Sequence, residues 1–476
     1  MKFIGRKYEI SLLQGEWAKD AASLIAIYGR RRVGKTRLVE EFYRDKNLWK
    51  FEGLEKQSKT RQINNFLSQL AEHSKDSAYK TASCKTWIDA FKFLDRAIIH
   101  SQHKHNIAVF FDELPYMANK RREMISELKW AWDNLWCNKS GFSLILCGSV
   151  ASFMVESVIN SSALYGRIKL EICLKPFSFG ECRDFMGPKY SNRELLDLYM
   201  ICGGIPEYLL QIDKSSSVAV NINRLAFTKD GYFTKEFSRI FKDMFYEDGI
   251  YKKIIMLFSR YKSLKTEELL EILSMSGGSG FSRYLKNLEL AQFVENFVPC
   301  GHPKESKLQR HRLIDEYLHF YFKFIHPNLK TIEPNTNKDI FSKILTSRSY
   351  QSWAGLAFER VCLKHINEII KALRIDQLVT DYGPYYDRAT NTKEGLQIDL
   401  MIERHDPAIT VCEMKYHCGK IGKWIIDEME RKVSLLPSTK KSIEKVLVTT
   451  EGITNDLREM NYFAKVLLLE DVFGKP

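Results

Sequence analysis

Residues 24–36 read Leu24-Ile25-Ala26-Ile27-Tyr28-Gly29-Arg30-Arg31-Arg32-Val33-Gly34-Lys35-Thr36. An apolar run of strand length ends at Gly29 and leads into the eight-residue pattern G-x-x-x-x-G-K-T. A helical pattern follows at once, with Leu38, Val39 and Phe42 on one face. A strand, a glycine-rich turn and a helix in this order are the context that a phosphate-binding loop requires. A chance glycine-rich turn does not account for the whole signature, so the stretch predicts a nucleotide-binding protein.

The chemistry of this Walker A pattern predicts a role for each residue. Successive backbone N–H groups would turn inward around an anion, and the helix N-terminus would add the positive end of its dipole. Lys35 would reach the β- and γ-phosphates of ATP, and the Thr36 hydroxyl would bind Mg²⁺. We therefore expect nucleotide contacts from Gly29, Arg30, Arg31, Arg32, Val33, Gly34, Lys35, Thr36 and Arg37.

Composition places the chain among ordinary globular proteins. Its 476 residues predict two to four domains, and 45% are hydrophobic while 28% are charged. No stretch approaches the ~18 apolar residues of a membrane span, and the first residues lack the apolar core of a signal peptide. The ten cysteines are scattered and form no C-x-x-C pair. These features predict a cytoplasmic protein with reduced thiols and no membrane partner.

The formal charge of +13 raises the question of a nucleic-acid partner. Residues 1–246 hold 38 basic and 28 acidic residues, residues 247–330 hold 13 and 10, and residues 331–476 hold 21 of each. The excess therefore lies in the part that carries the phosphate-binding loop. A solvated basic face and a site for a polyanion both account for it.

A second buried strand is predicted at residues 106–111, and it ends in Asp112-Glu113. Its apolar residues do not alternate with polar ones, as is typical of a strand covered on both faces of a parallel sheet. Ligands of such sheets bind at the carboxyl ends of the strands. Asp112 fits the second position of the Mg²⁺ site, and Glu113 fits the base that orients the attacking water.

Two further residues lie where they could contact the nucleotide. Ser149 follows a third buried strand, where its hydroxyl could bind the γ-phosphate or the attacking water, or could instead cap a helix. Arg167 stands in the tight turn Leu164-Tyr165-Gly166-Arg167. It could be supplied in trans to neutralise charge in the transition state, or it could be a surface arginine.

The motifs found so far also occur together in one known group of proteins. They are Phe3-Ile4-Gly5-Arg6, the Walker A loop, Asp112-Glu113-Leu114-Pro115, Cys147-Gly148-Ser149, Tyr165-Gly166-Arg167 and Gly203-Gly204-Ile205-Pro206. In this order they resemble the archaeal-type ATPases of the AAA+/STAND group of P-loop proteins, over roughly residues 1–245. The resemblance implies positions near the adenine for Gly5, Arg6 and Pro206.

Residues 246–326 predict a winged-helix domain. Helical patterns at 249–258, 266–275 and 281–289 are followed by strand candidates at 293–299 and 308–314. Arg283 and Lys286 would lie on the helix that enters a DNA major groove. In the related ATPases this module can instead pack on the nucleotide domain as a regulatory lid, and the small excess of positive charge does not separate the two roles.

A polar linker at 327–345 precedes the C-terminal region, where two more strands are predicted at 395–402 and 408–416. Asp399 lies on the first strand, and alternation puts Glu413 and Lys415 on one face of the second. Asp399 and Glu413 would hold Mg²⁺, Lys415 would stabilise charge or help to activate water, and Glu359 could add a ligand from the preceding helix. The alternative is an amphipathic strand whose charges face water.

This pattern resembles the PD-(D/E)xK nuclease superfamily, and its order matches the DUF234-type domain that is often fused to these ATPases. Ile398 stands where the superfamily name has proline. The segment is neutral overall and shows no evident phosphate-binding surface, so the sequence leaves open whether the domain cleaves nucleic acid or only binds.

Together these patterns predict an α/β protein in three parts. The first is an AAA+-like parallel sheet with a helical lid at 1–245, the second is the winged helix at 246–326, and the third is a restriction-endonuclease-like domain at 346–476. ATP and Mg²⁺ are the expected cofactors, and ATP would set the conformation or the homo-oligomeric state. DNA is the expected partner. The competing hypothesis is a regulatory ATPase switch whose C-terminal domain only binds DNA or a protein.

Overall fold

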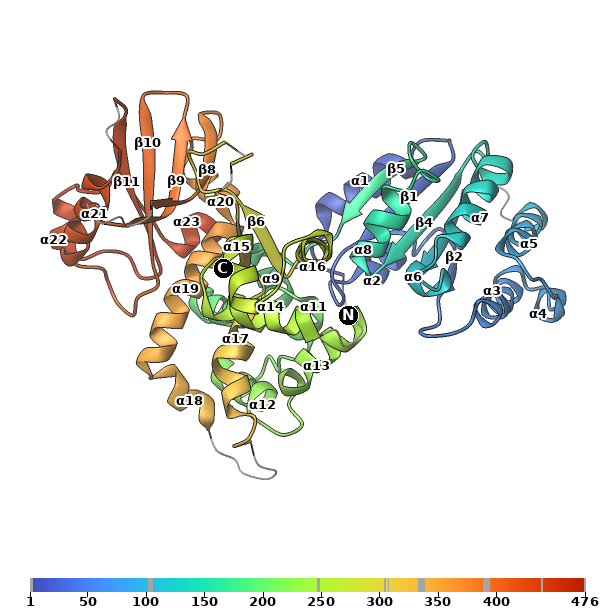
Figure 1. The fold of residues 1–476 in the computed structure, drawn as a ribbon, viewed down its shortest axis with the longest axis horizontal. Coiled ribbons are helices and arrows are strands. Elements are labelled where there is room, and N and C mark those ends of the chain that lie inside the picture. The colour runs from blue at the N-terminus through green and yellow to red at the C-terminus, as the bar shows by residue number, and fades with distance from the viewer. Residues whose placement is uncertain are drawn as a thin grey trace. The chain divides into compact units, whose positions relative to one another are not determined.

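The structure is a computed structural model (Figure 1) that describes residues 3–101, 106–245, 249–303, 305–306, 308–332, 339–387, 394–437 and 440–474. The chain forms two compact units. The first contains residues 1–176, 205–207 and 285–292, and the second contains 177–204, 208–284 and 293–476.

A five-stranded parallel sheet forms the centre of the first unit, with strand order β2-β3-β4-β1-β5. The strands are β1 (Ser23–Tyr28), β2 (Asn47–Glu52), β3 (Ile107–Asp112), β4 (Phe142–Gly148) and β5 (Ile168–Cys173). Every residue of β3 and β4 is buried, because helices cover both faces of the sheet. The α/β fold with a parallel sheet is thereby confirmed.

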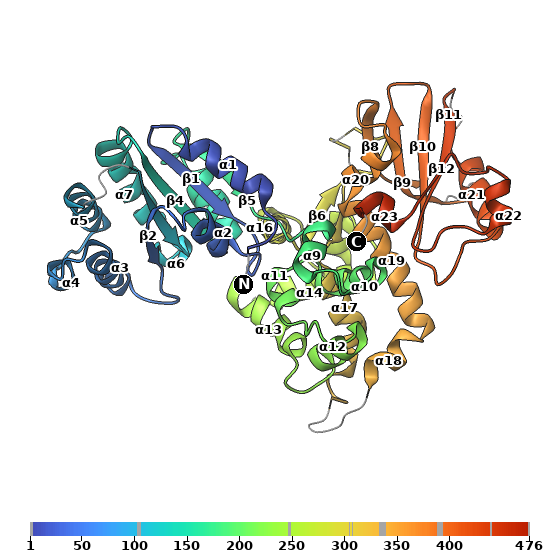
Figure 2. The ribbon, with the colours of Figure 1, turned by 180° about the vertical axis from the view of Figure 1, so that it is seen from behind.

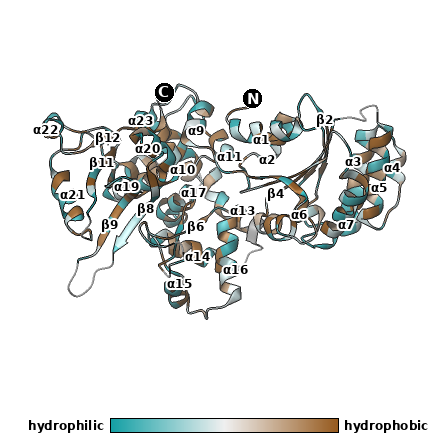
Figure 3. Ribbon diagram, turned by 90° about the horizontal axis from the view of Figure 1, so that it is seen from above, coloured by the Kyte–Doolittle hydropathy of each residue, from teal (hydrophilic) through white to brown (hydrophobic). Residues whose placement is uncertain are grey.

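The helices of this unit expose one face and bury the other. They are α1 (Lys7–Trp17), α2 (Lys35–Phe42), α3 (Lys59–Ser74), α4 (Ala78–Thr81), α5 (Trp87–His100), α6 (Leu114–Met117), α7 (Glu123–Ala131) with the π-turn Trp132–Trp136, and α8 (Ala151–Phe153) with the π-turn Met154–Ile159. In Figure 3 α1 and α2 lie on one side of the sheet and α6 and α7 on the other. The aromatic side chains of Phe51, Phe66, Phe91 and Phe111 pack against one another in the core.

The second unit begins with helices that follow the sheet in sequence. They are α9 (Phe179–Met186), α10 (Asn192–Cys202), α11 (Pro206–Leu210), α12 (Val218–Ala226) and α13 (Tyr232–Phe245). Serine caps begin α9 and α10, each with a glutamate three residues later that completes a capping box. Contacts place residues 177–204 and 208–245 in the second unit, although the sequence groups them with the sheet as its helical lid.

Three helices and a β-hairpin follow, in the order that the sequence predicts. They are α14 (Gly249–Arg260), α15 (Thr266–Leu273), α16 (Ser279–Leu290), β6 (Val294–Phe297) and β7 (Arg310–Leu313). The two strands pair antiparallel, with Val294 opposite Leu313. Residues 285–292, which include the second half of α16, are grouped with the first unit.

The connection to the C-terminal region is aromatic and helical. It consists of α17 (Glu316–Phe320), the π-turn Tyr321–Ile325, the 3₁₀-turn His326–Asn328, α18 (Ile340–Leu345), α19 (Arg348–Lys364) and α20 (Ile366–Leu373). Phe320 packs against Phe341 and Trp353. The predicted linker at 327–345 therefore contains α18, while its residues 333–338 lie outside the described residues.

A separate mixed sheet, in the order β12-β11-β10-β9-β8, forms the C-terminal part (Figure 2). Its elements are β8 (Val379–Asp387), β9 (Leu396–Arg404), β10 (Ala408–Lys415), α21 (Trp424–Ser434), β11 (Ser442–Thr449), α22 (Asn455–Glu459), β12 (Lys465–Leu467) and α23 (Leu469–Phe473). Strand β9 pairs antiparallel with β8 and β10, whereas β10, β11 and β12 run parallel. No helix of the described residues is long and apolar enough to span a bilayer.

Candidate functional sites

The loop between β1 and α2 has the backbone that the glycine-rich pattern predicts. Gly34 has φ +90° and Arg32 has φ +71°, so the chain turns through left-handed conformations before α2. A Cβ atom at Gly29 would lie 2.3 Å from the carbonyl oxygen of Leu174, so this position has no room for a side chain. The result is a tight turn that leads into the N-terminus of α2.

A chain of polar contacts links the ends of three neighbouring strands. Lys35 Nζ, on a largely buried side chain, donates to the carbonyl oxygens of Gly29 and Arg30 at 3.1 and 3.0 Å, and to Ser149 Oγ at 3.1 Å. The Ser149 hydroxyl in turn donates to Glu113 Oε1 at 2.5 Å. The capping role for Ser149 is wrong, because the residue that precedes α8 is Val150. Its hydroxyl instead joins the lysine to the predicted base.

Thr36 and Asp112 also lie together, as the sequence predicts. The Thr36 hydroxyl donates to Asp112 Oδ2 at 2.8 Å. One hydroxyl and one buried carboxylate beside a phosphate-binding loop fit a Mg²⁺ ion that also binds phosphate oxygens. Lys50 of β2 approaches Asp112 Oδ2 to 3.4 Å. Burial works against its charge, but Glu40, Asp112 and Glu52 outweigh that effect and raise the pKa of Lys50.

Glu113 has a left-handed backbone, with φ 50° and ψ 47°, at the point where β3 meets α6. This conformation is uncommon for a residue other than glycine and often occurs at functional sites. Both oxygens of its carboxylate face Ser149, since Oε2 also accepts the Ser149 backbone N–H at 3.3 Å. The carboxylate is therefore held next to the loop.

The residues implied by family resemblance lie in three different settings. Arg6 is buried and donates to the carbonyl oxygen of Val33 at 2.9 Å, so the N-terminal segment, with Gly5 at φ 73°, contacts the loop. Pro206 begins α11. Arg167 makes a two-pronged ion pair with Asp133, at 2.6 and 2.8 Å, which lowers the pKa of that carboxyl. A role for Arg167 in trans and an adenine contact by Pro206 stay predictions.

The C-terminal carboxylates are carried by paired strands. In the antiparallel pairing of β9 with β10, Leu400 lies opposite Cys412, and Asp399 and Glu413 are the next residues along the two strands. Asp399 Oδ2 accepts the backbone N–H of Met414 at 3.1 Å. Both carboxylates are buried, with 6% and 1% of the residue exposed. The interpretation in which these charges face water is therefore wrong.

Lysines surround this pair of carboxylates. Lys415 Nζ lies 2.8 Å from Glu413 Oε1, and Lys432 of α21 donates to both Glu413 oxygens at 2.8 and 2.6 Å. Glu428 of α21 accepts from Lys415 at 2.9 Å. A third lysine, Lys262, follows α14 and pairs with Glu359 of α19. Four carboxylates and three ammonium groups thus share this end of the sheet.

Burial controls the protonation of the two strand carboxylates. Burial and the neighbouring charge of Glu359 raise the pKa of Asp399, against the opposing charges of Lys432 and Lys262. Burial and Asp399 likewise raise the pKa of Glu413, against Lys432 and Lys415. The ionised form of each buried carboxylate is therefore energetically unfavourable, and a nearby cation would stabilise it.

Within the described residues no three His, Cys, Asp or Glu side chains converge on one position as metal ligands. Asp399 and Glu413 lie on neighbouring strands and carry the oxygen ligands that Mg²⁺ prefers, so these two fit the ion. Glu359 faces Asp399 but is paired with Lys262. Its part in a three-carboxylate metal site stays a prediction.

Sequence reasoning missed Lys262 and Lys432. Lys432 follows Glu428 by four residues on the amphipathic helix α21, which is a weak signal that the two share a face. Lys262 lies about a hundred residues before Glu359, and nothing in the sequence connects the two. Only the packing of the second unit brings them together.

Arg283 and Lys286 lie on exposed positions of α16. Lys286 Nζ is 3.6 Å from Glu156, and more than half of its side chain is exposed. Exposed cations on the third helix are compatible with DNA contact and with a solvated face. The DNA role of both residues stays a prediction.

The strand that carries Glu413 and Lys415 is also tied to α10. The Tyr416 hydroxyl donates to Asp197 at 2.7 Å, and the Arg193 guanidinium stacks on the Tyr416 ring at 3.9 Å. Arg193 also donates to the carbonyl oxygen of His417 and to Glu451. Helix α10 ends at Cys202 with Gly203 as its C-cap, just before the element Gly204-Ile205-Pro206.

His365 forms a second contact between the lid helices and the C-terminal part. Its Nδ1 lies 2.8 Å from the carbonyl oxygen of Val361, and its Nε2 accepts the Phe179 backbone N–H at 3.1 Å. This pattern requires the neutral ring with the proton on Nδ1, as assigned from these contacts. Burial lowers the pKa of His365, with the charge of Lys364 acting in the same direction.

We expect acid to weaken this contact. The unfolded state binds the proton more readily than the folded state, so stabilisation by His365 is fully present above about pH 6.5 and is lost as the pH falls below that value. His365→Gln keeps an acceptor but does not titrate. Between pH 7.5 and 5.5 the thermal unfolding midpoint should fall further in the native protein than in this variant. Equal falls would contradict the prediction.

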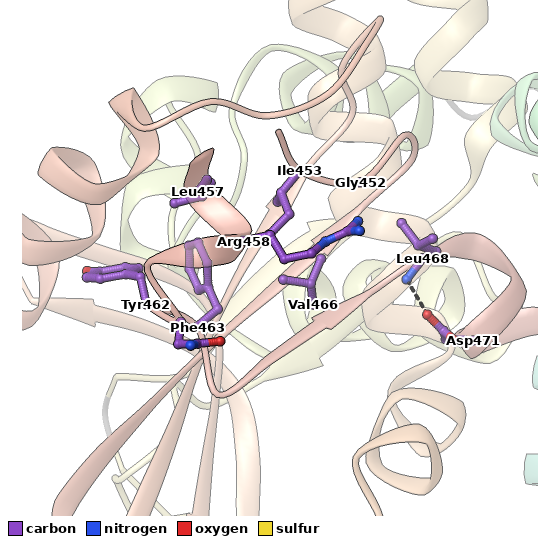
Figure 4. Close-up of a pocket in the computed structure, with 10 residues that line it drawn as sticks. Gly452, Ile453, Leu457, Arg458, Tyr462, Phe463, Val466, Leu468 and Asp471 are labelled. Carbon is purple, nitrogen blue, oxygen red and sulfur yellow. Dashed lines mark hydrogen bonds between the residues drawn. The ribbon is translucent and has the colours of Figure 1, made fainter. Parts of the chain in front are cut away.

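The described residues of the C-terminal part also line a cavity of about 260 Å³ (Figure 4). Leu457, Tyr462, Phe463 and Val466 supply apolar walls, while Arg458 and Asp471 are exposed at it. None of the carboxylates or lysines described above lines this cavity. It is therefore separate from the carboxylate–lysine cluster.

Comparisons with known proteins match two separate stretches of the chain. Residues 3–212 match the family described as an ATPase domain predominantly from Archaea. Residues 321–430 match the family DUF234, described as archaeal and bacterial proteins of unknown function. An uncharacterized protein of Methanocaldococcus jannaschii is 26% identical over 423 residues, which cover 87% of each chain.

Two shorter or more distant likenesses concern the nucleotide-binding part. An uncharacterized ATP-binding protein of the same organism is 46% identical over 46 residues, which cover 10% of this chain and 78% of that protein. The solved structure of a Walker-type ATPase from Pyrococcus abyssi has a TM-score of 0.50 at 15% identity, and covers 68% of this chain and 96% of that one. This likeness shows the fold. Residues 3–212 are thus similar to archaeal ATPase domains and have the fold of a Walker-type ATPase, and residues 321–430 are similar to the second family.

Proposed function

We propose that this protein hydrolyses ATP with Mg²⁺ and couples its nucleotide state to a C-terminal domain that cleaves nucleic acid. The observation that carries the ATPase part is the contact chain from Lys35 through Ser149 to Glu113, beside the Thr36–Asp112 pair. At one edge of the parallel sheet, Lys35 would bind phosphate, Glu113 would be the base, and Thr36 and Asp112 would hold Mg²⁺. These are the groups that phosphoryl transfer to water requires.

The residues of this edge would act in sequence once ATP is bound. Lys35 would exchange the carbonyl oxygens of Gly29 and Arg30 for phosphate oxygens, which carry more charge. Ser149 would orient the Glu113 carboxylate through the hydrogen bond that it already donates. Glu113 would accept a proton from the attacking water. Mg²⁺, held by Thr36 and Asp112, would neutralise charge on the phosphates.

Lys35→Ala tests the nucleotide site. This change removes the ammonium group that would bind the phosphate oxygens of ATP. We therefore expect ATP turnover to fall by about 10²–10³. Binding of a fluorescent ATP analogue should weaken as well. The control is Lys7→Ala, on the exposed first turn of α1, which removes the same charge away from the nucleotide site. Unchanged binding and turnover in Lys35→Ala would contradict the proposal.

Three features support a nuclease-like C-terminal domain. Asp399 and Glu413 lie on neighbouring strands, Lys415 pairs with Glu413, and all three belong to one mixed sheet. Two carboxylates would hold a metal ion that activates water and stabilises charge at a phosphodiester, and the lysine would stabilise the same charge. The test is cleavage of supercoiled plasmid with Mg²⁺ or Mn²⁺, with and without ATP.

Coupling between the two activities would pass through α10. This helix is continuous with the Gly-Ile-Pro element at its C-terminus, and it holds Tyr416, the residue after Lys415, through Arg193 and Asp197. A change at the nucleotide that moves α10 would therefore act on the strand that carries Glu413 and Lys415. The partner of the domain would be DNA, with Arg283 and Lys286 as added contacts.

One observation favours a second function, a regulatory switch whose C-terminal domain only binds. Both Glu413 oxygens are paired with lysines, and Glu359 is paired with Lys262. A cluster neutralised in this way has less affinity for a divalent cation. If the protein is a switch, Lys35→Ala removes the response to a partner, while changes at Asp399 and Lys415 leave that response intact.

A further inference from the structure

The contact between Lys262 and Glu359 joins two modules of the second unit. Lys262 lies in the connection between α14 and α15, two residues after α14 ends, and Glu359 lies on α19, which contacts β10. Their charged atoms are 2.5 Å apart. A cation from the three-helix module thus reaches a carboxylate of α19, the helix that packs on β10.

Lys262 interacts electrostatically with the proposed metal ligands and is not an ordinary surface lysine. The charges of Glu359 and Asp399 and the hydrogen bond to Glu359 outweigh the effect of burial and raise the pKa of Lys262. About a third of its side chain, 36%, is exposed, whereas Glu359 is 16% exposed and Asp399 is buried. Lys262 is therefore more exposed than its partner Glu359, and Asp399 lies deeper than either.

The charge balance of the cluster depends on this lysine. Glu359, Asp399, Glu413 and Glu428 supply four negative charges, and Lys262, Lys415 and Lys432 supply three positive ones. With Lys262 in place the cluster has a formal charge of −1, and without it the charge is −2. The second value suits a divalent cation, because burial of unpaired carboxylates is costly.

We propose that Lys262 is a tethered cation that takes the place of a metal ion at Glu359, beside Asp399 and Glu413, so that metal binds there only when Lys262 withdraws. The inference rests on the proposed metal-dependent function. It explains why Glu359, a carboxylate expected to hold an ion, is paired with a lysine instead. Anything that moves the α14–α15 connection away from α19 would open the site, which makes this module a gate for the C-terminal domain.

The test is Mn²⁺ binding, followed by electron paramagnetic resonance of the free ion in the nucleotide-free full chain. We expect Lys262→Gln to raise the affinity of the Asp399-dependent site by about 5- to 150-fold, the range of typical coupling between two ligands. Lys262→Arg keeps the cation and should bind Mn²⁺ as weakly as the native protein. Lys253→Gln, an exposed lysine of α14, carries the same charge change and should have no effect.

Adding Asp399→Asn to Lys262→Gln identifies the site and separates two failures. If the double variant loses the gain, the stronger binding is at the carboxylate cluster, as proposed. If Mn²⁺ binds in an Asp399-dependent manner with equal affinity in the native protein and in Lys262→Gln, the gate is refuted while the metal site stands. If no variant shows Asp399-dependent binding, the metal site itself is refuted, and the gate with it.

Discussion

Replacing Glu113 by Gln is expected to slow ATP hydrolysis by about 10²–10⁴, the usual contribution of a general base. Gln keeps the size of the side chain and an oxygen that can accept the hydrogen bond from Ser149, which the carboxylate receives at 2.5 Å. It cannot take a proton from the attacking water. ATP binding should therefore stay within a few-fold of the native value, because Lys35 and the loop are unchanged. Single-turnover hydrolysis and equilibrium ATP binding measure the two effects separately.

The matched control is Glu171→Gln, an exposed carboxylate on β5 of the same sheet. It makes the same chemical change and should leave both measurements unaltered. Undiminished turnover in Glu113→Gln would exclude this residue as the base. Lost binding together with lost turnover would mean that Glu113 shapes the loop through Ser149 instead of acting on water.

The second large effect is expected at Asp399. Asp399→Asn keeps an oxygen for the Met414 backbone N–H but removes the charge that would hold the ion. A bound metal supplies several kcal/mol of stabilisation to the transition state, so nicking of supercoiled plasmid with Mg²⁺ or Mn²⁺ should fall by at least about 10². Lys415→Ala should also lose nicking activity, as Asp399→Asn does, because it removes the cation beside Glu413.

Asp376→Asn, at an exposed position just after α20, is the control for the same change of residue. Comparing reactions with ATP, without ATP and with Glu113→Gln would reveal whether bound nucleotide or its hydrolysis controls nicking. Absence of nicking in the native protein under all of these conditions, with ATP binding intact, would favour the switch. Nicking that survives in Asp399→Asn would show that the cluster is not the cleavage site.

The Walker A pattern and the buried strand ending in Asp112-Glu113 were sufficient to predict the parallel sheet and its phosphate-binding edge. The reason is local, because periodicity, glycine spacing and chain order are enough to specify a strand, a tight turn and a helix. The order of helices and strands from α14 to β7 was also predicted from periodicity alone. Their pairing in the structure follows the predicted hairpin.

Other features depend on residues that are distant in sequence. Ser149 was expected to bind phosphate or cap a helix, but tertiary packing brings it between Lys35 and Glu113. Arg167 was expected as a finger or a surface residue, and the structure pairs it with Asp133. The linker prediction missed α18. The stretch is polar and contains prolines, so its composition does not indicate a helix, and the six-residue helix α18 is instead packed through Phe341.

Local sequence therefore decided where this chain binds nucleotide and which residues its C-terminal sheet presents. The state of those C-terminal carboxylates was decided by long-range packing. Lys432 reaches Glu413 from α21, and Lys262 reaches Glu359 from a module almost a hundred residues away in the chain. Which distant charges pair depends on how the buried surfaces pack against each other. Periodicity and residue spacing in the sequence do not indicate this packing. The ion pairs at the proposed metal site could be found only in the folded molecule.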